Sequence, residues 1–75
     1  MNESLEKVTV SAAHLKALRE ARGLKQNEVA DTIGVTKSAL SMYERGRQRC
    51  PSYVLARLSI LYGEPIEQFI EEAAA

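Results

Sequence analysis

Four glycines divide the chain into short segments, and their spacing constrains the fold more than any other feature. Gly23, Gly34, Gly46 and Gly63 each follow a segment in which apolar residues recur at helical intervals. Glycine is the residue most often found directly after a helix, so each marks a helix end. A chain of 75 residues has room for one domain with one small core. The pattern therefore predicts a compact all-α domain built from short helices.

The segments between the glycines predict five helices. Ser11 is a suitable N-cap for the first, which continues to about Arg22. Its apolar positions are Leu15, Leu18 and Ala21, with charged residues on the other side. The remaining helices are expected over residues 26–33, 37–45 and about 51–62, followed by a short fifth helix from 64–65 to about 71. In that last helix, Ile66, Phe69 and Ile70 are expected to close the core.

The two ends of the chain lie outside this pattern. Residues 1–10 show weak alternation of apolar residues without a cap, so we expect a flexible N-terminal arm. A short strand that pairs across a dimer is the alternative for this segment. Residues 72–75 are expected to fray, which leaves 11–71 as the folded domain.

The composition excludes several classes of function. Cys50 is the only cysteine and His14 the only histidine, so neither an intrachain disulfide nor a Cys/His zinc site can form. No P-loop, dinucleotide fingerprint or paired-carboxylate motif is present, and we expect no catalysis, cofactor or small-molecule ligand. A reactive thiol at Cys50, activated by nearby arginines, is one interpretation, although we favour an incidental loop cysteine.

The sequence offers no sign of a membrane protein. We find no signal-peptide pattern at its start and no apolar run of the length that a membrane span needs. We therefore expect a cytoplasmic protein with no membrane partner.

The net charge of zero conceals an uneven distribution of charge. Residues 16–25 carry three net positive charges and residues 37–57 carry four, whereas residues 58–75 carry four net negative charges. A neutral chain can therefore present a basic face to a nucleic acid, with its acidic residues elsewhere.

The most informative segment is the pair of helices over residues 26–45. Gly34 follows the first helix and Thr36 caps the second, so the turn between them is very short. Ala30 is small where the helices must cross closely, and Leu40 is apolar where the second must dock on the core. This arrangement is typical of a helix-turn-helix, whose second helix can enter the major groove of DNA.

From about Ala13 to Ile70 the sequence resembles the Cro and phage-repressor (XRE) type of helix-turn-helix protein. The features that carry the resemblance are Gln26-x-x-x-Ala30, the Gly34-Val35-Thr36 turn, and the ending Tyr43-Glu44-Arg45-Gly46. The resemblance implies a five-helix lambda-repressor-like bundle that binds operator DNA as a two-fold dimer. It predicts a transcriptional regulator, favoured to be a repressor.

The helix over residues 37–45 is the expected recognition helix. One of its faces carries Lys37, Ser38, Ser41, Met42 and Arg45. The family reads bases from the positions of Lys37, Ser38 and Met42, and Ser41 is expected to assist them. The alternative is a solvated face without a ligand.

A second group of residues is expected to contact phosphates. By resemblance, the amide of Gln26 binds a phosphate at the start of its helix, where Lys25 adds a charge but lacks a capping oxygen. Thr36 is a cap first and a phosphate contact second. The remaining expected phosphate contacts are Arg45, Arg47 and Arg49. The resemblance further implies a partly buried, structural salt bridge between Arg19 and Glu44.

Taken together, these features predict sequence-specific binding to a palindromic or pseudo-palindromic double-stranded DNA operator by a homodimer. The dimer contact is expected among Tyr53, Arg57, Tyr62, Phe69 and Ile70. The alternative is an antitoxin or adaptor that uses the same fold to bind protein, which an acidic or apolar recognition face would favour.

Overall fold

Four helices account for most of the residues that the computed structural model describes, namely 8–65 and 70–72. They are α2 (Ala12–Ala21), α3 (Gln26–Ile33), α4 (Lys37–Glu44) and α5 (Ser52–Tyr62). Each begins and ends within about one residue of its predicted position. The all-α prediction is confirmed for these four helices.

Side-chain caps and glycines fix the helix ends. The Ser11 hydroxyl accepts the backbone N–H of His14 at 3.2 Å, and the Thr36 hydroxyl accepts that of Ala39 at 3.0 Å. Gly34 ends α3 in the left-handed conformation at φ +76°. A residue with a Cβ would be strained at that φ, so the sharp turn into α4 depends on a glycine.

One apolar core lies between the helices. Its fully buried side chains come from all four, and the largest are Leu15, Val29, Leu40, Val54 and Leu58. The prediction for α2 is wrong in one position. Ala21 is exposed, whereas Arg19 is buried on the side that faces α4. The apolar spacing alone did not indicate that a charged side chain would occupy the interior.

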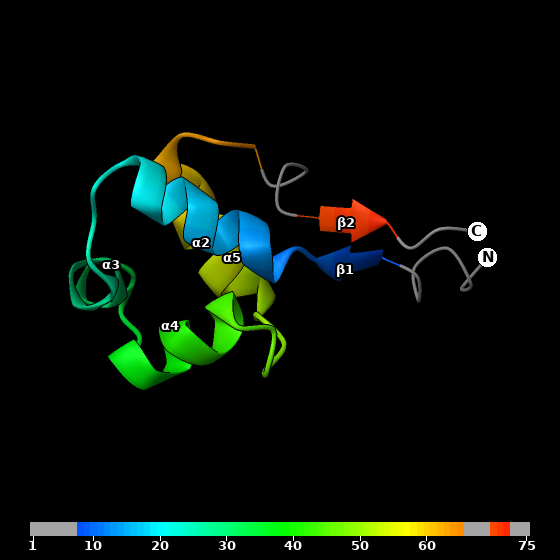
Figure 1. Cartoon of the computed structure of the whole chain (residues 1–75), viewed down its shortest axis with the longest axis horizontal. Coiled ribbons are helices and arrows are strands. Elements are labelled where there is room, and N and C mark those ends of the chain that lie inside the picture. The colour runs from blue at the N-terminus through cyan, green and yellow to red at the C-terminus, as the bar shows by residue number, and fades with distance from the viewer. Residues whose placement is uncertain (1–7, 66–69, 73–75) are drawn as a thin grey trace.

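The helices are arranged so that α4 remains open on one side. α4 packs against α3 and α2, and α3 also contacts α5. In Figure 1, α3 lies at one end of the helical body, while two short strands extend from the other end. The helix that carries most of the candidate site residues therefore runs along the surface, with its apolar side on the core.

The two strands join segments that are far apart in the sequence. β1 (Val8–Val10) pairs antiparallel with β2 (Ile70–Glu72), with Val8 opposite Glu72 and Val10 opposite Ile70. This corrects three expectations. Residues 8–10 are a strand within the arm, this strand pairs within the chain, and Glu72 belongs to the pairing instead of a frayed end. A ribbon whose halves are separated by most of the chain has no local sequence signal.

The predicted fifth helix falls mainly on residues that the structure does not describe. Ile66 and Phe69 lie outside the described residues, as do 1–7 and 73–75. Ile70, expected in that helix, is in extended β2 instead. Pairing with the β-branched residues of β1 provides its backbone partners.

Candidate nucleic-acid interface

A shallow hollow of about 340 Å³ opens on the solvent side of α4. It is lined by Gln26, Lys37, Ser38, Ser41, Met42 and Arg45. Four of these residues are in α4, Arg45 follows its last turn, and Gln26 begins α3. The structure thus brings together all the expected base-contacting residues and two of the expected phosphate-contacting residues.

The two faces of α4 differ sharply in burial. Leu40 and Tyr43 are buried against the core, as expected from their spacing. Lys37 and Ser38 are exposed, and Ser41 and Met42 are half-buried. Because the core fixes one face, the opposite face is held rigidly toward solvent.

The thioether of Met42 has a cationic neighbour at the edge of the hollow. Arg45 donates from Nη2 to Met42 Sδ at 3.5 Å. The interaction is weak, since a thioether is a poor acceptor. The Arg45 guanidinium therefore remains available to a stronger acceptor such as a phosphate.

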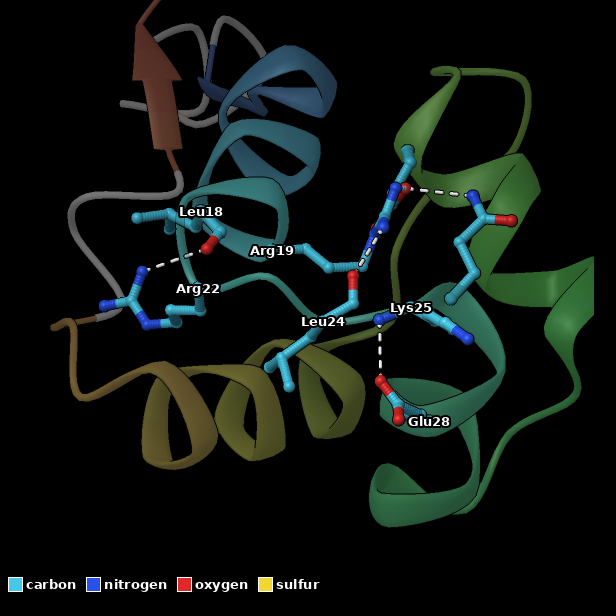
Figure 2. Close-up of polar contacts among 8 residues, drawn as sticks. Leu18, Arg19, Arg22, Leu24, Lys25 and Glu28 are labelled. Atoms are coloured by element: carbon cyan, nitrogen blue, oxygen red, sulfur yellow. Dashed lines mark hydrogen bonds and ion pairs between the residues drawn. The ribbon is translucent and has the colours of Figure 1, made fainter.

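Behind the hollow, Arg19 of α2 forms a buried ion pair with Glu44 at the end of α4. Arg19 Nε donates to Glu44 Oε2 at 2.8 Å, and Nη2 donates to Oε1 at 3.0 Å. Arg19 Nη1 donates to the carbonyl of Leu24 at 2.8 Å. Figure 2 shows Arg19 reaching toward Leu24, while Arg22 turns away beside Leu18. The hydrogen bond with Glu44 is the main cause that raises the pKa of Arg19. This is the salt bridge implied by the resemblance.

Gln26 connects the ion pair with the hollow. Its Nε2 donates to Glu44 Oε1 at 3.0 Å. The Gln26 amide is therefore held between the buried carboxylate and the open face of α4. This bond could not be predicted from the sequence, because a glutamine at the start of a helix can turn to several partners.

At the start of α3, Lys25 provides no side-chain cap, and Glu28 makes a different contact. The backbone N–H of Lys25 donates to Glu28 Oε1 at 2.9 Å, which is half of a capping box (Figure 2). Glu28 stands three residues after the cap position, a spacing that could have revealed this contact in the sequence. The Lys25 residue itself is exposed beside the first turn of α3.

A match to a known family model decides the family of this chain. A model described as helix-turn-helix, HTH_3, matches residues 15–69. The chain belongs to the HTH_3 helix-turn-helix family. The matched range includes all four helices except the first turn of α2.

Two curated relatives of this HTH_3 domain are named as regulators. It is 36% identical over 64 residues to a putative HTH-type transcriptional regulatory protein of Thermococcus gammatolerans, covering 85% of this chain and 20% of that protein. It is 34% identical over 62 residues to the cryptic phage CTXphi transcriptional repressor RstR of Vibrio cholerae, covering 83% and 56%. The chain thus spans about a fifth of the Thermococcus protein and just over half of RstR.

The fold comparison supports the same architecture. The P22 c2 repressor, solved in complex with synthetic operator 9T, superposes with a TM-score of 0.75 at 20% identity, covering 81% of this chain and 92% of that one. At this identity the likeness establishes the fold. The expected phage-repressor type of helical domain is confirmed at that level.

The remaining predicted phosphate residues of the HTH_3 domain are exposed but do not line the hollow. Thr36 is exposed at the start of α4, where its hydroxyl serves as the cap. Arg47 and Arg49 are exposed in the segment between α4 and α5. Within the described residues, neither arginine side chain forms an ion pair or hydrogen bond, so both guanidinium groups face water.

Two side chains differ from expectation because they are buried. Burial raises the pKa of the Cys50 thiol to about 11, so the reactive-thiol interpretation is wrong. Tyr62, expected in the dimer contact, is only 4% exposed and lies beneath the guanidinium of Arg22. By contrast, Tyr53 is 55% exposed and Ile60 is 82% exposed, and the sequence analysis did not single out Ile60.

Two features are absent from the part of the chain that the structure describes. No helix there is both long and apolar enough to cross a bilayer. Among the same residues, no three His, Cys, Asp or Glu side chains cluster in a way that would hold a metal ion.

Proposed function

We propose that this HTH_3 domain binds double-stranded DNA sequence-specifically and regulates transcription, with α4 in the major groove. The observation that carries the proposal is the open face of the second helix of the helix-turn-helix. It combines a lysine, two serines and a methionine, whose groups can read base edges, over a helix held rigidly by the core.

Each residue of this face matches a feature of the major groove. Lys37 can donate to O6 or N7 of guanine, and Ser38 and Ser41 can donate or accept. Met42 can pack on the methyl group of thymine. All four line the same hollow, so one short stretch of base pairs can contact them together.

Around this face lie the six proposed phosphate contacts, four of which are cationic and form a basic border. Gln26 and Arg45 lie on its edges, and Lys25, Thr36, Arg47 and Arg49 are exposed nearby. Such contacts fix the register of the protein on the duplex and make binding depend on salt. The basic border favours DNA over the alternative protein-binding module, because the α4 face is neither acidic nor apolar.

The relatives agree with this function. RstR is named as a transcriptional repressor, and the Thermococcus protein as an HTH-type regulator. Repression by occupying an operator is the simplest mode of action for a domain of this kind.

For the dimer contact we propose an exposed stripe on α5 made of Tyr53, Arg57 and Ile60. These residues recur one helical turn apart, and two of them are large and apolar. To contact two half-sites one turn of DNA apart, two-fold pairing must set the two α4 helices about 34–36 Å apart. Sedimentation should show that Ile60→Glu is monomeric at concentrations where wild-type protein and the control Ala17→Glu are dimers. A monomeric wild-type protein would contradict this contact.

The function itself is tested by selection from a randomised DNA pool, followed by a salt titration on the selected sequence. We expect a palindromic or pseudo-palindromic motif whose affinity falls steeply as salt rises. Weak binding without a motif would refute the proposal, and protein partners would then be sought.

A further inference from the structure

Arg57 of α5 contacts the turn of the helix-turn-helix itself. Its Nη1 donates to the carbonyl of Ile33, the last residue of α3, at 2.8 Å. The last carbonyls of a helix lack intrahelical partners and carry partial negative charge, so a guanidinium is a favourable partner there. A Cβ on Gly34 would lie 3.2 Å from the same Nη1. The guanidinium therefore packs directly over the glycine of the turn.

Tyr53 holds Arg57 in this position. The guanidinium carbon lies 5.2 Å from the centre of the Tyr53 ring, one helical turn earlier on α5. The side chain is thus fixed by a ring on one side and by the end of α3 on the other. Neither contact was expected from the sequence, which suggested Arg57 only as part of a dimer contact.

The turn is too short to absorb a movement of α3. Only residues 34–36 separate the end of α3 from the start of α4. Val35 N–H donates to the carbonyl of Ala30 at 3.0 Å, and Thr36 caps α4. A displacement at Ile33 must therefore be passed to the first turn of α4, which carries Lys37 and Ser38.

We propose that Arg57 is a positioning residue for DNA readout, which fixes the turn between α3 and α4 and is itself held by Tyr53. It sets the angle at which Lys37 and Ser38 meet the bases without contacting DNA. This inference rests on the proposed function, because its effect is on specific binding. It assigns to α5 a role in readout in addition to its proposed role in dimerisation.

The test compares Arg57→Met with Lys16→Met, which also removes one exposed positive charge. Binding to the selected operator and to unrelated DNA is measured across a range of salt, at protein concentrations where sedimentation shows each variant to be dimeric. For Arg57→Met we expect a roughly 2- to 30-fold loss of operator affinity. Its salt slope and its affinity for unrelated DNA should match those of Lys16→Met. Arg57→Lys should restore part of the loss, and Tyr53→Leu should reproduce part of it.

A readout without DNA separates this inference from the proposed function. In NMR spectra of the free protein, Arg57→Met should shift the amide signals of residues 33–38, while Lys16→Met leaves them in place. Shifted amides without specific DNA binding by wild-type protein would refute the proposed function and leave the turn contact intact. Unmoved amides in both Arg57→Met and Tyr53→Leu would overturn the inference. A salt slope lowered by about one would also overturn it, because Arg57 would then be a phosphate contact.

Discussion

The buried network at Glu44 and the open hollow beside it occupy neighbouring parts of α4, yet they use polar side chains in opposite ways. Glu44 accepts hydrogen bonds from Arg19 and Gln26, and its carboxylate is fully engaged inside the protein. Lys37 and Ser38 are exposed and make no contact of this kind within the described residues. A charge with several fixed partners contributes to the fold, whereas polar groups held rigidly toward solvent are available to a ligand.

The two regions should therefore respond differently to substitution. Substitutions in the network should change the free energy of unfolding, and substitutions in the hollow should change DNA affinity with little effect on stability. Gln26, which belongs to both regions, should show both effects.

The largest effect is expected at Glu44. Glu44→Ala leaves the Arg19 guanidinium buried without its carboxylate and should lower the free energy of unfolding by about 3–5 kcal/mol. Urea unfolding followed by circular dichroism measures this loss. Glu20→Ala, an exposed carboxylate on α2, is the control and should change stability by less than about 0.5 kcal/mol. The double variant Arg19→Met/Glu44→Leu should recover most of the loss, and a cost below about 1 kcal/mol for Glu44→Ala would contradict this role.

Cys50 extends the comparison to a second buried ionisable group. Unlike the Glu44 carboxylate, its thiolate has no hydrogen-bond donor among the described residues to stabilise it. Burial raises its pKa from 9.0 to about 11 in the folded protein. The unfolded chain therefore loses the thiol proton first as pH rises above 9, so stability should fall between pH 9 and 11 by up to about 2–3 kcal/mol. Below pH 9 the thiol should contribute no pH dependence.

Cys50→Ala isolates this contribution in unfolding experiments at several pH values. Tyr62, whose pKa is raised to about 12, adds a loss above pH 10 that both proteins share. The variant should therefore lose less stability than wild type between pH 9 and 11. Equal losses in the two proteins would show that the thiol is not buried as described.

Gln26 should show both effects in moderate size. Gln26→Ala removes one hydrogen bond to Glu44 and should cost about 1 kcal/mol of stability. It should also weaken binding to all DNA sequences alike, since its proposed partner is a phosphate. Asn27→Ala, at the next and exposed position, should change neither quantity appreciably. A loss of stability with unchanged DNA affinity would place Gln26 in the network alone.

The smallest effect is expected at Met42. Replacing its proposed thymine by uracil removes one methyl group and should cost wild-type protein about 0.8 kcal/mol, roughly a fourfold loss of affinity. Met42→Ala should show almost no difference between the two bases. Binding titrations with the four combinations provide the measurement, and equal uracil penalties in both proteins would exclude Met42 as the methyl contact.

Most of the helical fold could be predicted from the sequence because its signals are local. Ser11 and Thr36 are caps at the predicted positions, and Gly34 has the left-handed conformation that its place after a helix suggested. The ribbon of β1 and β2 could not be predicted in this way, since each strand of three residues is specified only by its distant partner.

In the candidate site, too, the features with a local sequence signal could be predicted and the others could not. The face of α4 follows from helical periodicity, so Lys37, Ser38 and Met42 were correctly expected to lie together. The contacts of Arg57 with Ile33 and of Gln26 with Glu44 depend on how separate helices pack, and one sequence carries no signal for that. Tyr62 was misplaced for a similar reason, because it is buried beneath Arg22, which lies 40 positions earlier in the sequence.

The most direct test of base reading by α4 is to repeat the selection from randomised DNA with two variants. Lys37→Met should lose its preference at one or two neighbouring positions of each half-site and keep the rest of the motif. Arg47→Ala should keep the whole motif while binding every sequence more weakly, with a salt slope shallower by about one. If both variants select the wild-type motif unchanged and lose affinity alike, Lys37 does not read bases, and the proposed orientation of α4 in the major groove is wrong.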